Sequence, residues 1–96
     1  MANRGAKGRR AEWRSRDWLQ SQGYEVVRAA GSKGAFDLVA WNDEEILLVN
    51  VKCNCWAPPM ERLAMSGTVA PPNARRVMHR WDDRARAPRV QELEAA

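Results

Sequence analysis

Residues 34–54 constrain the fold of this 96-residue chain more than any other stretch. Residues 36–41 are mostly apolar and of strand length, residues 42–44 have the Asn and Asp chemistry of a tight turn, and residues 45–52 are rich in leucine and β-branched side chains. Two such runs on either side of a short turn predict two antiparallel strands. The other elements should therefore pack around this hairpin.

The polar residues of this hairpin are expected to meet at one edge of the sheet. Side chains alternate between the faces of a strand, so Asn50 and Lys52 share a face, whereas the odd-numbered positions 47–51 are all apolar. Asp37 stands at the start of the first strand, which in an antiparallel hairpin lies beside the end of the second. An acid, an amide and an amine should converge there.

This convergence predicts a site for a divalent cation. Mg²⁺ takes oxygen ligands, such as the Asp37 carboxylate and the Asn50 carbonyl, and keeps several of its waters. A lysine that faces the same way, Lys52, can position a water molecule and offset phosphate charge.

These residues also carry a resemblance. Phe36-Asp37, followed after a strand's length by Asn50-Val51-Lys52, resembles the core of the PD-(D/E)XK nucleases. Together with Glu12 upstream and the run GYEVVR and AGS at residues 23–28 and 30–32, the pattern is similar to the archaeal-type Holliday junction resolvases and their phage relatives. The likeness covers the first half of the chain well and the second half loosely.

The resemblance implies a Mg²⁺-dependent endonuclease that resolves four-way DNA junctions, with Mn²⁺ as a substitute ion. The implied catalytic residues are Glu12, Ser32, Asp37, Asn50 and Lys52. Of these, Glu12, Asp37 and Asn50 would be metal ligands, and Ser32 would lie near the scissile phosphate. Without the resemblance, Glu12 would be an ordinary glutamate near a helix N-terminus, where the helix dipole favours it.

One position departs from the family pattern. The family has Glu, Asp or sometimes Gln where this chain has Asn50, which brings no charge to a cation. The strand itself offers no acid in its place, because Glu44 has the right parity but lies about 20 Å back along it. A non-catalytic or weakened DNA-binding module on the same fold therefore stays open. A restriction- or repair-type nuclease of the same superfamily that acts on linear duplex DNA also stays open, because backbone contacts carry no sequence information and branch recognition depends on dimer geometry.

Basic residues gather at the two ends of the chain. The net charge is +4, and the first 16 residues hold six Lys or Arg against one acid. Such clusters neutralise phosphates and release counterions, so we expect DNA contacts. The expected contact residues are Arg4, Lys7, Arg9, Arg10 and Lys33. The alternative is a solvated surface that keeps the protein soluble.

Length and pattern predict one α/β domain over residues 1–96 with a restriction-endonuclease-like core. A flexible basic arm at residues 1–8 should precede a helix at 9–22, and a second helix at 60–66 should follow three strands that form a mixed or antiparallel sheet. One or two strands, at 75–81 and 89–93, should return to the sheet.

The expected surroundings of the protein follow from the same features. We expect both helices on one sheet face, and the other face to pair with a second copy through Leu47, Val49 and Trp41. A homodimer would match the two-fold symmetry of a branched DNA substrate.

No run approaches about 20 apolar residues, so we expect no membrane span and a cytoplasmic location, in the host if the gene is a phage gene.

Overall fold

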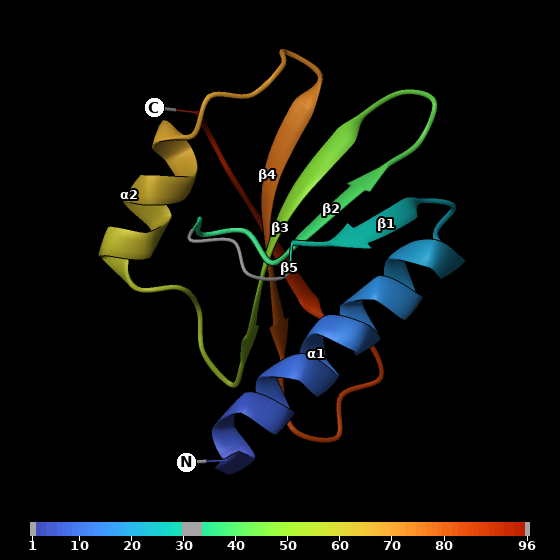
Figure 1. Cartoon of the computed structure of the whole chain (residues 1–96), viewed down its shortest axis with the longest axis vertical. Coiled ribbons are helices and arrows are strands. Elements are labelled where there is room, and N and C mark those ends of the chain that lie inside the picture. Colours follow the sequence, from blue (N-terminus) through green and yellow to red (C-terminus); the bar gives the residue numbers. More distant parts are fainter. Residues whose placement is uncertain (1, 30–33, 96) are drawn as a thin grey trace.

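The computed structural model describes residues 2–29 and 34–95, with side chains described from Gly8 onward. A five-stranded sheet lies between two helices, with α1 and α2 on either side of the central strands (Figure 1). The elements in chain order are α1 (Ala2–Ser21), β1 (Glu25–Arg28), β2 (Leu38–Trp41), β3 (Ile46–Cys53), α2 (Pro59–Gly67), β4 (Ala74–Trp81) and β5 (Arg89–Leu93).

The sheet is mixed, which is one of the two arrangements predicted. Its strands follow chain order, β1-β2-β3-β4-β5. β1, β2 and β3 pair antiparallel, β3 and β4 pair parallel across the α2 connection, and β4 pairs antiparallel with β5. Parallel neighbours need a crossover segment, and α2 supplies it here. The predicted α/β class is confirmed.

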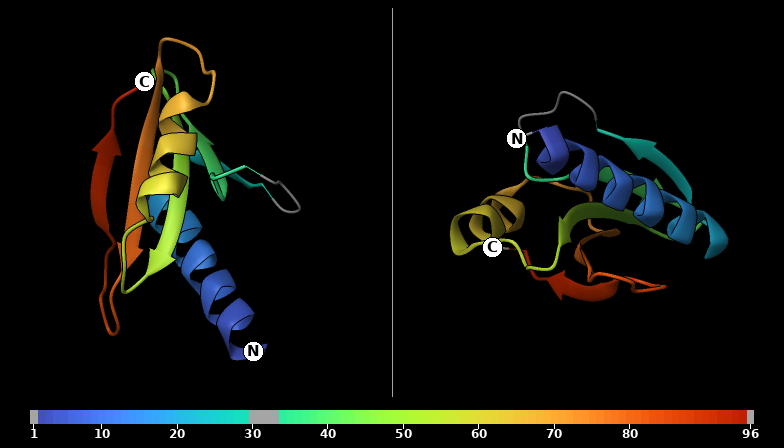
Figure 2. Two further views of the ribbon diagram at one scale, coloured as in Figure 1. Left: turned by 90° about the vertical axis from the view of Figure 1, so that its left-hand side faces the viewer. Right: turned by 90° about the horizontal axis from the view of Figure 1, so that it is seen from below.

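The helices pack on opposite faces of the sheet, which corrects our expectation of one shared face. Leu19 of α1 packs in a cluster with Val49 and Val77, whereas Met65 of α2 packs with Met78. Residues 77 and 78 are neighbours on β4 and so point to opposite sides. In the right-hand view of Figure 2, α1 lies on one side of β3 and β5 lies on the other. A central strand buried on both faces is the usual consequence of a crossover helix.

Two of the three residues expected at an interface with a second copy are buried within the chain. Leu47 is 6% exposed and Val49 is 0% exposed, because both pack beneath α1. Trp41, at 38%, stays exposed. The assignment of Leu47 and Val49 to a subunit interface is therefore wrong.

Helix α1 begins at Ala2 and not near Arg9, so residues 2–8 belong to the helix and do not form a separate arm. Gly5 and Gly8 suggested a later start, since each glycine costs about 1 kcal/mol relative to alanine inside a helix. The alanine, arginine and lysine residues around them favour helix and offset that cost.

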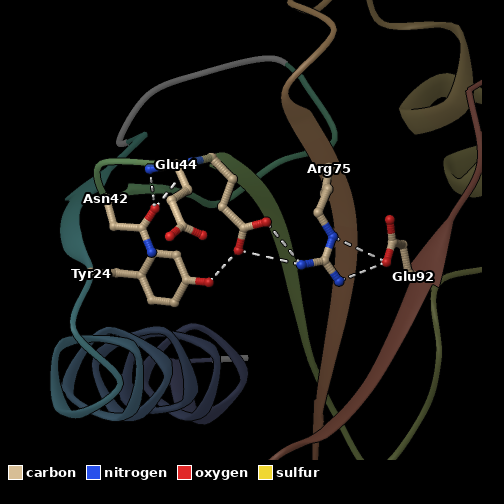
Figure 3. Close-up of polar contacts among 6 residues, drawn as sticks. Tyr24, Asn42, Glu44, Arg75 and Glu92 are labelled. Atoms are coloured by element: carbon tan, nitrogen blue, oxygen red, sulfur yellow. Dashed lines mark hydrogen bonds and ion pairs between the residues drawn. The ribbon is translucent and has the colours of Figure 1, made fainter.

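Polar contacts tie the strands together at the turn end of the sheet (Figure 3). Asn42 Oδ1 accepts the backbone N–H groups of residues 44 and 45 at 2.9 and 3.0 Å, which forms the predicted turn between β2 and β3. The Tyr24 hydroxyl donates to Glu45, and Arg75 Nη1 donates to Glu45 at 3.0 Å. Arg75 also donates to Glu92 of β5 at 2.7 Å, so one guanidinium of β4 links β5 to the residue that precedes β3.

A buried polar group connects α1 to β4. The Ser15 hydroxyl accepts a hydrogen bond from Trp81 Nε1 at 2.6 Å and lies 2.9 Å from His79 Nδ1. Its proton is therefore free to be donated to His79. Burial lowers the pKa of His79 to about 4, so the ring is neutral at ordinary pH.

A buried arginine fixes the end of α2. Arg76 of β4 is 8% exposed, and its Nε donates to the Met65 carbonyl at 2.9 Å while Nη2 donates to the Thr68 carbonyl. These carbonyls belong to the C-terminal end of α2, where a cation is favoured. Arg76 thus anchors the helix on β4. No helix among the described residues is long and apolar enough to cross a membrane.

Candidate functional site

Asp37 is held at the edge of the sheet by β3. Its backbone N–H donates to the Val49 carbonyl at 2.8 Å, and its Oδ2 accepts the Val51 N–H at 2.7 Å. The β2–β3 register, in which Leu38 pairs with Val49, sets Asp37 opposite Asn50. The structure therefore brings the acid and the amide together as the strand pattern predicted.

The surroundings of Asp37 concentrate negative charge. Burial raises the pKa of the Asp37 carboxyl, and the nearby carboxylates of Glu12 and Glu61 raise it further. The Val51 N–H and the Lys52 ammonium act in the opposite direction and lower this pKa. A half-buried carboxylate beside two others is an environment in which a bound cation would be favoured.

Asn50 is buried, with one of its polar atoms unpaired. The residue is 2% exposed, and its Nδ2 donates to the Ala35 carbonyl at 2.8 Å and to Glu61 Oε2 at 3.3 Å. Its Oδ1 is buried without a hydrogen-bond partner. Such an orphaned carbonyl oxygen is costly, and it fits an oxygen-seeking cation such as Mg²⁺.

Lys52 extends from the same face of β3 and pairs with Glu61. Its Nζ lies 3.1 Å from each carboxylate oxygen of Glu61, in the first turn of α2. The sequence pattern did not predict a role for Glu61, because strand alternation relates only residues of the same strand. The available signal was Pro58-Pro59 followed by Glu61, which is typical of a helix start with an acidic first turn.

Glu12 reaches the same place from α1. It lines a cleft of about 470 Å³ together with Asp37 and Lys52, and it accepts a hydrogen bond from Arg28 Nε at 2.7 Å. The remaining residues that line this cleft are Gly8, Val51, Cys53 and Cys55. Helix α1, strand β3 and the residue before β2 thus present two carboxylates and an amine to a common opening.

The side chains of four residues expected at the site or in contact with DNA are not among those that the structure describes. Ser32 and Lys33 lie outside the described residues. Arg4 and Lys7 belong to α1, but their side chains are not among those described. Arg9 and Arg10 are exposed on the first half of α1.

The acidic side chains at this place do not form a complete carboxylate cage. Among the described residues, no three His, Cys, Asp or Glu side chains gather closely enough to hold a metal ion by themselves. A cation here would use an amide oxygen, water or a DNA phosphate for part of its shell. This composition fits Mg²⁺, which usually binds through one or two carboxylates plus water and substrate phosphate.

Comparison with known proteins agrees with this geometry. A solved structure of Hjc, a Holliday junction resolvase from Archaeoglobus fulgidus, superimposes with a TM-score of 0.75 at 24% identity, covering 88% of this chain and 76% of that chain. This likeness shows a shared fold. None of the curated proteins compared with the sequence matches it. The sequence model of the archaeal Holliday junction resolvase (Hjc) family matches residues 3–58, which is more than half of the chain. This chain therefore belongs to the archaeal Holliday junction resolvase family.

Proposed function

We propose that this protein is a divalent-cation-dependent endonuclease that cuts four-way DNA junctions, with Mg²⁺ as the natural ion and Mn²⁺ as a substitute. The observation that carries the proposal is the position of Asp37. Its carboxylate is oriented by the Val51 N–H at 2.7 Å, beside Asn50 and on a cleft shared with Glu12 and Lys52.

Each residue at this edge has a distinct role in the proposal. Asp37 and the unpaired Asn50 Oδ1 would hold the cation, and Glu12, which lines the cleft with Asp37, would assist them. When bound, the cation supplies charge for the developing phosphate oxyanion and lowers the pKa of a water. Lys52 positions that water and offsets phosphate charge, and Ser32 would lie near the phosphate. The Val51 amide keeps the Asp37 carboxylate in a fixed orientation.

The DNA backbone would be held by the basic face of α1. Arg9 and Arg10 are exposed there, and Arg4, Lys7 and Lys33 complete the proposed set. A homodimer would present two sites to the two equivalent strands of a junction. Light scattering should give the mass of a dimer at micromolar concentration, and a monomer mass would count against this assembly.

A second candidate is a DNA-binding module that has lost cleavage. The observation that favours it is the neutral side chain of Asn50 at the position of an acidic ligand. In that case junction binding should persist with no product in any metal ion. A nuclease specific for linear duplexes is a third candidate, distinguished by its substrate.

Cleavage of a labelled four-way junction and of a matched linear duplex, in Mg²⁺, Mn²⁺ or EDTA, tests these candidates. The wild type should nick the junction symmetrically in Mg²⁺ or Mn²⁺ and not in EDTA. Asp37→Ala should lose cleavage and retain binding, whereas Asp43→Ala, in the exposed β2–β3 turn, should cut normally. Junction cleavage that persisted in Asp37→Ala would overturn the site assignment.

A further inference from the structure

We propose that Glu61 supplies the acidic cation ligand that the chain lacks at position 50. The inference rests on the proposed function, because it completes the cation site of that nuclease. Glu61 belongs to the first turn of α2, whereas the acid of the family pattern lies on the strand that carries Asn50 and Lys52.

The contacts of Glu61 place its carboxylate against two residues of the proposed site, Asn50 and Lys52. One oxygen, Oε2, lies 3.3 Å from Nδ2 of Asn50, so Glu61 touches the side chain that stands where the family has an acid. Both oxygens lie 3.1 Å from Lys52 Nζ. Glu61 also raises the pKa of Asp37 through its charge, so the two carboxylates are within electrostatic reach of each other.

The chemistry of Asn50 and Glu61 is complementary. An amide can donate a hydrogen bond to Glu61, whereas an aspartate or glutamate at position 50 would repel it. The pair therefore carries one negative charge, the same charge as an acid at position 50 beside a neutral residue. The amide also leaves its buried Oδ1 unpaired and available as a neutral ligand. We infer that the carboxylate has moved from β3 to α2 while the charge of the site has been kept.

Helix α2 is positioned to make this exchange possible. It follows β3 closely and is fixed at its far end by Arg76, so Glu61, in its first turn, cannot drift far from the strand. The side chains of Lys52 and Glu61 are each about one-third exposed, at 32% and 30%. An ion pair so open to water is weak. A cation can therefore compete with Lys52 for Glu61, which would release the Lys52 amine toward the cleft.

Calorimetric titration of the DNA-free protein with Mn²⁺ tests the inference without relying on cleavage. Glu61→Gln should weaken Mn²⁺ binding roughly 10- to 100-fold, because losses of this size follow removal of even the outer partners of metal ligands. The double variant Asn50→Asp with Glu61→Gln should recover most of the lost affinity, since it returns the carboxylate to β3. Asp37→Asn should also weaken binding. Glu44→Gln, an exposed glutamate in the β2–β3 turn, should bind as the wild type does.

The possible failures are distinguishable. If Glu61→Gln binds Mn²⁺ normally while Asp37→Asn does not, Glu61 is no ligand and the proposed nuclease site stands without it. If Glu61→Gln loses binding and the double variant does not recover it, Glu61 acts through Lys52 and the exchange of ligands is wrong. If the wild type without DNA binds no Mn²⁺, this inference fails, and the cleavage assay in Mg²⁺, Mn²⁺ or EDTA decides the proposed function separately. Circular dichroism of each variant excludes unfolding as the cause.

Discussion

The buried histidine of β4 should make stability depend on pH. His79 is 1% exposed and its pKa is lowered to about 4 by burial, whereas in the unfolded chain it titrates near its ordinary value of 6.5. The unfolded state therefore binds more protons between these two values. The contribution of His79 to stability is fully present above about pH 6.5 and is lost as the pH falls toward 4.

The size of this effect follows from the two pKa values. At 1.36 kcal/mol per pKa unit, the free energy of unfolding should fall by about 2 kcal/mol between about pH 7 and pH 4.5 through His79 alone. Other groups titrate in the same range, so the measurement is a comparison. Urea unfolding of the wild type and of His79→Gln should be followed at both pH values. Glutamine is chosen because it does not titrate and its side-chain oxygen can still accept a hydrogen bond from the Ser15 hydroxyl.

The variant should lose about 2 kcal/mol less than the wild type on acidification, whatever its stability at neutral pH. The comparison removes the contribution of carboxyl groups common to both proteins. Equal acid dependence in the two proteins would refute the prediction, because it would show that His79 does not titrate across the unfolding transition as its burial requires.

Three further outcomes test the packing and the DNA contacts. Leu38→Ala, at a side chain 1% exposed between α1 and the sheet, should cost about 2–5 kcal/mol in urea unfolding, and a cost below 1 kcal/mol would contradict its place in the core. Arg76→Met should cost about 2–3 kcal/mol, because it leaves the Met65 and Thr68 carbonyls without their charged donor, and an unchanged midpoint would refute that anchoring role. Deletion of residues 1–8 should weaken binding to all DNA sequences alike and reduce the slope of log affinity against log salt by up to about 2, as expected for two lost phosphate contacts. An unchanged slope would remove the start of α1 from the DNA interface.

Local sequence pattern was enough to predict the strands and the central part of the site. The turn predicted at residues 42–44 is formed, and the Asn42 side chain accepts two backbone N–H groups within it. The strand at residues 89–93 has the predicted bounds. Asp37 lies beside Asn50 because two properties are local: alternation along a strand, and reversal of direction at a short turn. Both residues belong to one hairpin, so the sequence of that hairpin alone predicts that their side chains lie close together.

Tertiary structure decided the features that depend on how distant segments pack. Glu61 is nine residues from Lys52 in sequence, on a helix whose orientation depends on the crossover and on Arg76, so no strand or helix periodicity relates the two. The placement of α2 opposite α1, which buried both faces of β3, likewise depends on the course of the connection to β4. Periodicity determines which side chains of one element share a face. Which other element covers that face, and which charge it brings, is settled only when the whole chain packs.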